Sequence, residues 1–500
     1  MLRCRLVSAG KLKTEVQNKQ KRGGPIMELD EALKAIGFGC GQVLVLVFSS
    51  LANLLAVNET FGMSIVVVAS SCDLETTAGQ KSLMMTAMMA GMTISGFYVG
   101  YLIDIKGRVR ILRWMLLVTI LLSVISALMP EVYSLSAMRF LVGVFLCGPA
   151  TCILGYMTEF SAPHARPPLV VLFSLGVGIS LIYCPLVAKF FLPERICANE
   201  DGSYVVRSWR FLMMLYTLPG LFGLLGLWFL PESPYYLMSV KRKEETYEVL
   251  DWLCRRNRKQ IEDLNIDLLD FPRDTIVAKA NYFKLVWNDT IRLVKPPYCR
   301  DFMVCTLLSF GMFLISLGLG MWYPLLRNQD NSQHRLLCDV LSQPKNFDQP
   351  KSNVSATNEM PNFTDPLYYG IAYILFYFLA LFLLVFISRK HVFVVYVSLA
   401  AGCGLALNFI KEPIVILICF SAMMILPGVL IILVSSVLVD CMPTQLRAKA
   451  LSLNKALSRL GAIIGCLLVG LLLKVSCLVT LNIFVAYLIF CIILCFLLPK

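Results

Sequence analysis

The segment Gly100-Tyr-Leu-Ile-Asp104-Ile-Lys106-Gly107-Arg108-Val-Arg110 separates two long apolar runs. The first run ends near Leu102 and the second begins near Ile111, so charged side chains crowd one short connection. Charges are costly inside a bilayer, and basic residues gather in the loops that flank membrane spans. The segment is therefore predicted to lie at a membrane surface between two spans.

The composition of the whole chain indicates an integral membrane protein. Of its 500 residues, 58% are hydrophobic and 15% are charged, whereas soluble domains carry about a quarter charged residues. The formal net charge of +13 would suggest a nucleic-acid partner for a soluble domain. Here the basic residues concentrate in particular connecting segments, which is a topology signal. We expect a lipid bilayer as partner, and no nucleic acid.

Cysteine and histidine usage favours neither redox nor metal chemistry. The 18 cysteines form no Cys-x-x-Cys motif, and the three histidines lie far apart in the sequence. No set of intramembrane side chains has catalytic spacing. We therefore expect no metal site, no cofactor and no enzymatic activity, and we expect a monomer.

Apolar runs long enough to span a bilayer occur twelve times. They lie near 43–68, 82–102, 111–129, 134–158, 168–191 and 209–230, and then near 302–325, 367–388, 391–410, 413–439, 448–473 and 476–498. The predicted fold is an all-α membrane protein with twelve transmembrane helices in two pseudo-symmetric six-helix halves. The predicted parts are a disordered tail (1–28), an N-terminal bundle (29–230), a linker with short helices (231–301) and a C-terminal bundle (302–500). Met27 is a candidate alternative start.

The distribution of basic residues predicts the orientation. The tail, the 103–113 loop, the 159–167 loop and the 231–301 segment are rich in Lys and Arg, which places them and both termini in the cytoplasm. Two N-glycosylation acceptors, Asn353-Val-Ser355 and Asn362-Phe-Thr364, fall in the 327–366 loop on the opposite side. Cys72, Cys197 and Cys338 lie in or beside outer loops and allow one disulfide, whose pairing stays open. The membrane is predicted to be the plasma membrane or that of a secretory or synaptic vesicle.

An internal repeat supports the division into two halves. Glu159, Pro163 and Arg166 follow the fourth span, and Asp440, Pro443 and Arg447 follow the tenth, in the same order. The charged segment between the second and third spans has a weaker counterpart after the eighth span, Ser388-Arg389-Lys390, which lacks an acid.

These motifs carry a family resemblance. Gly100, Asp104, Gly107 and Arg108 match the Gly-x-x-x-Asp-(Arg/Lys)-x-Gly-Arg-(Arg/Lys) loop of the major facilitator superfamily, although Ile105 and Val109 stand where that family usually has basic residues. Pro231-Glu-Ser-Pro234 resembles the signature after the sixth helix of sugar and organic-ion transporters, with Tyr235 replacing the usual Arg. With Gly37-Phe-Gly39, Tyr156-x-x-Glu159 and Arg459-Leu-Gly461, residues 29–498 resemble the branch that holds synaptic vesicle glycoprotein 2 and the organic cation and anion carriers.

The resemblance implies a secondary active transporter of small organic solutes, organic ions among them, that works by alternating access with protons as a candidate coupling ion. It also implies a cytoplasmic gate, in which Asp104 and Arg108 brace the helix ends with Glu159 as salt-bridge partner. The candidate gate residues are Gly100, Asp104, Gly107, Arg108, Glu159, Arg166, Asp440 and Arg447. The alternative is interfacial charge without a gating role.

Ionisable residues inside the spans are the candidate substrate and coupling residues. Glu59 lies about nine residues from the outer end of the first span and Arg139 about five from the outer end of the fourth, so the two could share a layer. We hypothesise a buried pair whose breaking is linked to proton or cation binding; the alternative is a static pair. Arg459 is a candidate contact for an anion or carboxylate, whereas Lys449 and Lys455 are predicted to extend to the interface.

One departure from the family pattern favours a rival function. The vesicle branch has Asp-Gly-x-Glu in its first helix, and this sequence has Ala56-Val-Asn-Glu59. The missing Asp favours a transport-silent vesicle or surface glycoprotein that acts as an interaction platform.

Overall fold

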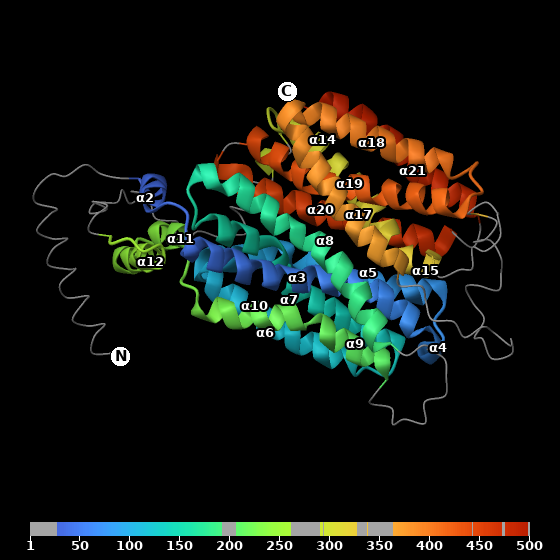
Figure 1. Cartoon of the computed structure of the whole chain (residues 1–500), viewed down its shortest axis with the longest axis horizontal. Coiled ribbons are helices and arrows are strands. Elements are labelled where there is room, and N and C mark those ends of the chain that lie inside the picture. The colour runs from blue at the N-terminus through green and yellow to red at the C-terminus, as the bar shows by residue number, and fades with distance from the viewer. Residues whose placement is uncertain are drawn as a thin grey trace, which may run out of the picture.

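The computed structural model is helical throughout the part of the chain that it describes, and no strand occurs there (Figure 1). The described residues are 28–192, 207–261, 291–293, 295–327, 338, 364–442, 444–472 and 476–498, without the side chains at 72, 97, 101, 104, 444, 445 and 448. The predicted glycosylation positions Asn353 and Asn362 and the candidate disulfide residue Cys197 lie outside these ranges, as does the predicted tail up to residue 27.

The N-terminal half is a bundle of long apolar helices. It consists of α3 (Cys40–Ala69), α5 (Ala78–Lys106), α6 (Arg108–Ala127), α7 (Val132–Thr158), α8 (Arg166–Phe191), α9 (Ser208–Tyr216) and α10 (Leu218–Phe229), with the short connections α4 (Ser71–Leu74) and η1 (Pro163–Ala165). The predicted sixth span is divided between α9 and α10, because Pro219 falls in the first turn of α10 and has no N–H to continue the helix.

The C-terminal half begins with a span whose helical geometry changes along its length. This span runs through α14 (Cys299–Phe313), the π-helix η3 (Leu314–Leu319), the 3-10 helix η4 (Gly320–Trp322) and α15 (Tyr323–Arg327). It is followed by α17 (Thr364–Phe386), α18 (Arg389–Ala406), α19 (Pro413–Cys441), α20 (Thr444–Leu472) and α21 (Cys477–Leu497). In η3, a Cβ added to Gly318 would lie 2.8 Å from the Cα of Gly465 in α20, so both glycines are needed for this backbone contact.

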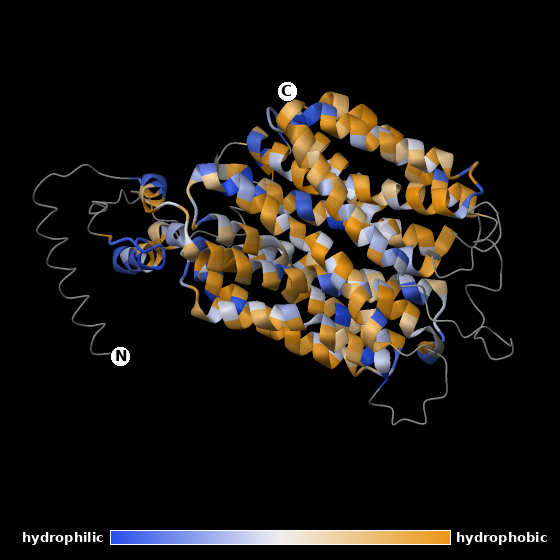
Figure 2. Ribbon diagram, in the orientation of Figure 1, coloured by the Kyte–Doolittle hydropathy of each residue, from blue (hydrophilic) through white to orange (hydrophobic). Residues whose placement is uncertain are grey.

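Hydrophobic residues predominate along the helices of both bundles (Figure 2), and many large apolar side chains among them are exposed. Phe229 and Phe409, for example, are 80% and 81% exposed. A surface of this kind suits hydrocarbon rather than water. Ten helices, counting consecutive segments as one, are long and apolar enough in the described residues to cross a membrane. Helices α5 and α18 complete the twelve; α5 packs against α7 and α20, and α18 packs against α19 and α21.

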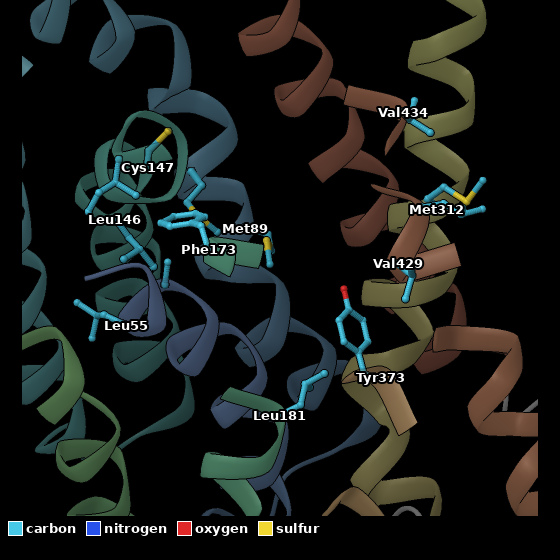
Figure 3. Packing of buried hydrophobic residues seen from close by; sticks show 14 of the residues in the cluster. Leu55, Met89, Leu146, Cys147, Phe173, Leu181, Met312, Tyr373, Val429 and Val434 are labelled. Carbon is cyan, nitrogen blue, oxygen red and sulfur yellow. The ribbon is translucent and has the colours of Figure 1, made fainter. Parts of the chain in front are cut away.

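The two halves contact each other through a few helix pairs. α5 packs against α20, α8 against α17, and α3 against η4 and α15. Figure 3 shows buried side chains of both halves, with Tyr373 of α17 between Leu181 of α8 and Val429 of α19. The helices that make the contacts between the halves therefore also contribute side chains to the core of their own half.

The two ends of the molecule differ in what covers them. Helices α2 (Leu29–Ile36), α11 (Pro234–Ser239) and α12 (Lys243–Arg256) lie together at one end, on the left of Figure 1, which we call the linker end. There the Asn257 side chain accepts a hydrogen bond from the Gly41 N–H (3.0 Å) and donates to Gln42 Oε1 (2.9 Å). The opposite end, with α4 and α15, is called the loop end.

A disulfide joins Cys338 to Cys477 at the start of α21. Cys338 is one of the three candidates from the sequence, but its partner is not, because Cys477 stands at the head of an apolar run and has the sequence context of a membrane span. The side chain of the candidate Cys72 is outside the described part.

Candidate functional site

Glu59 and Arg139 form an ion pair inside the N-terminal bundle. An Arg139 Nη1 donor contacts Glu59 Oε2, and the Nη2 donor reaches the Glu59 carbonyl oxygen at 2.9 Å. The other carboxylate oxygen accepts a hydrogen bond from the Ser123 hydroxyl of α6 at 2.5 Å. The side chains are only 2% and 3% exposed. The two residues therefore share a layer, as their depths along the two spans predicted, and each charge has a partner out of water.

The surroundings of this pair connect it to the space between the halves. Asn58, next to Glu59, donates to the Tyr216 carbonyl at 3.2 Å and accepts a hydrogen bond from the Cys184 thiol at 3.5 Å. Cys184 in turn lines a cavity of about 30 Å³ at the loop end, together with residues of both halves such as Phe61 and Tyr323. The ion pair thus lies one layer of side chains behind the contact between the halves.

Arg459, near the middle of α20, reaches across to the N-terminal half. Its Nη1 donates to the Met92 carbonyl of α5 at 3.2 Å and to the Cys147 Sγ of α7 at 3.5 Å, and the residue is 6% exposed. A guanidinium prefers a planar anion such as a carboxylate, and both of its partners here are uncharged. Arg459 is therefore a charged group held between the halves by uncharged partners.

Lys455 lies one helical turn from Arg459 and is half-buried. The groups that influence its ammonium electrostatically are Arg459 and the thiols of Cys147 and Cys152 on α7. That Lys449 and Lys455 extend to the interface stays a prediction.

The halves are joined tightly at the loop end. Ser82 of α5 donates to the Cys466 carbonyl of α20 at 3.5 Å, across the two halves. The fully buried Trp322 indole, which belongs to the same half as Cys466, donates to that carbonyl at 3.1 Å. A Cβ added to Gly470 would lie 1.9 Å from Ser82 Oγ.

At the linker end, Arg108 pairs with Glu159, as the family resemblance implied. The Glu159 carboxylate also accepts a hydrogen bond from the Ser233 hydroxyl. The side chain of Asp104, the third member expected there, is outside the described part. The pair links the start of α6 to the end of α7 and to the linker.

Glu232 is a residue of this network that the sequence did not reveal. Its carboxylate accepts hydrogen bonds from the backbone N–H groups of Arg108 and Val109, both at 2.9 Å, and so caps α6. Gly107 makes room for it, because its φ is +104° and an added Cβ would lie 2.7 Å from Glu232 Oε2. The Pro-Glu-Ser-Pro signature therefore caps one helix as well as ending another. The signal for the cap in the sequence was its acidic residue, because a carboxylate can accept hydrogen bonds from the free N–H groups at a helix N-terminus.

Glu232→Ala is expected to lower the free energy of unfolding by about 1 kcal/mol, because the first N–H groups of α6 lose a charged acceptor. Thermal unfolding of the detergent-purified protein measures this. Glu248→Ala, an exposed change in α12, is the matched control. Equal unfolding curves for the two variants would contradict the capping role.

The second half repeats the linker-end geometry. Arg389, at the start of α18, pairs with Asp440, so the acid that the Ser388-Arg389-Lys390 segment lacks is supplied by the end of α19. Arg166 Nε donates to the Ser161 carbonyl at 3.0 Å, and Arg447 Nε donates to the Met442 carbonyl at 2.9 Å, each five residues back. The internal repeat predicted from Glu159–Arg166 and Asp440–Arg447 is thus present in the hydrogen bonds.

Arg166 also ties the N-terminal half to its short helices. Its Nη2 donates to Asp30 of α2 at 2.7 Å and to the Tyr235 hydroxyl of α11 at 2.6 Å. Burial and the hydrogen bond to Asp30 raise the pKa of Tyr235 to about 12, so the phenol keeps its proton and donates it to that carboxylate. Tyr235 thus joins a charge cluster at the position where the family usually has an Arg.

Among the described residues, no group of three or more His, Cys, Asp or Glu side chains has a metal-binding arrangement.

Comparison with solved structures identifies the class of protein that this fold defines. The chain superposes on the inward-open xylose transporter XylE from E. coli with a TM-score of 0.63 and 16% identity, over 92% of this chain and 96% of that one. A second structure, of a D-xylose-proton symporter, gives a TM-score of 0.61 and 14% identity, over 92% and 98%. At such identities the likeness shows the fold, which is that of the membrane transporters of the major facilitator superfamily. The chain belongs to the family described as "Sugar (and other) transporter", whose model matches residues 45–324, more than half of its length.

Relatives by sequence fall in the branch that the motifs indicated. The chain is 30% identical to "Putative transporter svop-1" of Caenorhabditis elegans, over 47% of this chain and 42% of that protein. It is 28% identical to "Organic cation/carnitine transporter 7" of Arabidopsis thaliana, over 48% and 45%, and 21% identical to "Synaptic vesicle glycoprotein 2B" of Rattus norvegicus, over 53% and 42%. The matches span less than half the length of these relatives. The resemblance to this branch is confirmed, and the family's members are transporters, not enzymes.

Proposed function

We propose that the protein is a secondary active transporter that moves small organic solutes by alternating access. The observation that carries this proposal is Arg459, a charged side chain of one half that is held between the halves by a backbone carbonyl and a thiol of the other. A buried charge without a charged partner is costly, and in membranes it marks a substrate or ion site. Its place at the middle of α20 agrees with the midplane sites of transporters built from repeats.

The access route follows from the difference between the two ends. Contacts of Ser82 in one half with Cys466 and Gly470 in the other close the loop end, which favours access from the linker end. The pairs Arg108–Glu159 and Arg389–Asp440 each lie within one half, so in this state they brace the helix ends of each half. When the halves rock, these ends would approach each other and close the linker end.

Solute binding would compete with the contacts that Arg459 now makes. An acidic group of a solute is a stronger partner for the guanidinium than the Met92 carbonyl is, because the hydrogen bond would then join two opposite charges. Binding would therefore release one link between α20 and α5 and allow the halves to rearrange. This favours organic anions among the family's range of solutes.

Glu59 and Arg139 are the proposed coupling pair. A proton on Glu59 would remove the charge that holds the Arg139 guanidinium, at a position one layer behind the contact between the halves. Protons are therefore the proposed coupling ion.

The proposed orientation has the linker end in the cytoplasm. The Cys338–Cys477 disulfide supports it, because disulfides persist on the oxidising side of a membrane, where the charge rule and the two glycosylation acceptors also place the 327–366 loop. We propose a monomer in the plasma membrane or in a secretory or synaptic vesicle membrane, with both termini cytoplasmic.

A transport-silent interaction platform is the second candidate. Ala56 stands where the vesicle branch has an Asp, and the chain resembles proteins named synaptic vesicle glycoproteins. In that case the Glu59–Arg139 pair would serve to hold helices together.

An untargeted comparison of solutes distinguishes the two candidates. Vesicles that carry the protein and vesicles that carry an Arg459→Gln variant are incubated with a mixed extract, and the accumulated solutes are identified by mass spectrometry. We expect at least one small organic solute to accumulate only with the unchanged protein. Contents equal to those of protein-free vesicles, with the unchanged protein folded and inserted, would contradict transport and support the platform.

A further inference from the structure

A hollow of about 500 Å³ lies between the start of α6 and the end of α10, at the linker end. Arg110, Arg113 and Trp114 of α6 line one side of it, and Trp228 and Glu232 line the other. Helix α6 packs mainly against α7 and α10, and α10 mainly against α3 and α6, all within the N-terminal half. The hollow therefore lies on the side of this bundle that faces away from the other half (Figure 1).

The rim of the hollow is apolar and exposed. Trp114 and Trp228 are 60% and 59% exposed, and Phe229 lies next to Trp228 at the end of α10. Trp114 is only about two turns from the start of α6. Tryptophans near the ends of membrane spans lie at the level of the lipid headgroups. The hollow therefore opens toward lipid at headgroup depth.

Arg113 is held in this hollow by uncharged groups. Its Nε donates to the Leu227 carbonyl at 2.9 Å and its Nη2 to the Leu230 carbonyl at 2.6 Å, at the end of α10. The guanidinium carbon also lies 5.8 Å from the centre of the Trp228 ring. No described carboxylate forms an ion pair with Arg113, and its Nη1 makes no hydrogen bond within the described part of the chain. The guanidinium is thus fixed in orientation and keeps one donor group for a further partner.

Arg110 adds a second cation to the same hollow. It is exposed, and its side chain forms no ion pair with a described residue. Residues at i and i+3 of a helix are neighbours, so Arg110 and Arg113 are close to each other. The carboxylate that lines the hollow, that of Glu232, accepts hydrogen bonds from the backbone N–H groups of Arg108 and Val109 at 2.9 Å. Its charge is directed at the start of α6, and the two guanidinium groups remain available to an anion.

We propose that this hollow binds an anionic phospholipid of the leaflet at the linker end. The lipid phosphate would accept hydrogen bonds from Arg110 and from Arg113 Nη1, because a guanidinium matches the geometry of a phosphate. The acyl chains would lie along the exposed apolar side chains of α6 and α10. A zwitterionic phospholipid would bring a cation toward the same two arginines, and a free phosphate would leave the apolar rim uncovered. Basic pockets beside membrane helices bind anionic headgroups in this way.

Native mass spectrometry of the purified full chain, titrated with defined lipids, tests the proposal without a transport assay. The probes are dioleoylphosphatidylglycerol and dioleoylphosphatidylcholine, which have the same acyl chains and differ in net charge, and inorganic phosphate. The variants are Arg110→Gln and Arg113→Gln. Arg300→Gln, which removes an exposed arginine from the linker end of α14, is the matched control.

We expect the first phosphatidylglycerol to bind at least tenfold more tightly than the first phosphatidylcholine. Arg110→Gln and Arg113→Gln should each weaken phosphatidylglycerol binding about fivefold and leave phosphatidylcholine binding unchanged, and Arg300→Gln should change neither. Arg110 is exposed, so its variant tests the proposal even where the loss of two carbonyl contacts prevents Arg113→Gln from folding. No preference for the anionic lipid, an equal loss in Arg300→Gln, or inorganic phosphate that binds as tightly as the lipid would overturn the proposal.

The position of the lipid is tested by fluorescence quenching in proteoliposomes, because brominated acyl chains quench tryptophans that they contact. Brominated phosphatidylglycerol should quench the protein more strongly than brominated phosphatidylcholine. This difference should disappear in the double variant Trp114→Phe/Trp228→Phe. A difference that persists in the double variant would place the anionic lipid elsewhere and overturn the assignment to this hollow.

Discussion

Glu59→Gln is expected to lower the free energy of unfolding by about 3–5 kcal/mol. The change leaves the Arg139 guanidinium charged in a position where both side chains are 2–3% exposed, and the cost of an unpaired buried charge is of this size. Chemical or thermal unfolding of the purified protein in detergent measures it. Glu131→Gln, at the exposed start of α7, is the matched control.

The double variant Glu59→Gln/Arg139→Gln should recover part of this loss, because it leaves no charge behind. If the single and double variants unfold alike, the pair does not stabilise the bundle. The coupling role needs a variant that keeps the pair, and Ser123→Ala removes only the hydroxyl that donates to Glu59. An unchanged pH dependence of transport in Ser123→Ala, and in Glu59→Gln where it folds, would exclude proton coupling through Glu59.

Arg459→Gln is expected to slow the uptake of anionic solutes on the order of thirtyfold or more, because it removes one partner of a buried charge pair with the solute. Arg459→Lys keeps the charge without the planar fork and should give an intermediate rate. Initial uptake rates in proteoliposomes measure both. Arg300→Gln, an exposed change at the linker end of α14, is the control. Anion uptake at the unchanged rate in a folded Arg459→Gln protein would remove Arg459 from the solute site.

The residues predicted correctly from the sequence are those whose positions follow from counting along a helix or from a local motif. Twelve spans follow from apolar length, and the shared layer of Glu59 and Arg139 follows from their depths. Whether these residues act in coupling remains a prediction. The pairing of Arg108 with Glu159 came from the family resemblance, since nothing in the spacing brings those two residues together.

The contacts that the sequence analysis missed depend on how each helix is rotated about its axis and on which helix ends lie next to each other. Glu232 reaches backbone groups more than a hundred residues away, and Arg389 finds Asp440 across 51 residues. Cys477 was hidden in an apolar run. In each case the decisive partner is set by tertiary packing, which a local pattern does not contain.

The uneven distribution of charge between the halves has an evolutionary consequence. The acidic residues Glu59 and Glu159 of the N-terminal bundle form ion pairs with Arg139 and Arg108 of the same bundle. The helix α20 instead contributes two cations, and it contacts α5 through the Met92 carbonyl, a backbone group that no side-chain substitution can remove. Cargo preference can therefore diverge through replacements on a single helix, without disturbing the pairs that hold the other bundle together. Descendants of a common ancestor could in this way keep the same movement of the two halves and transport different solutes.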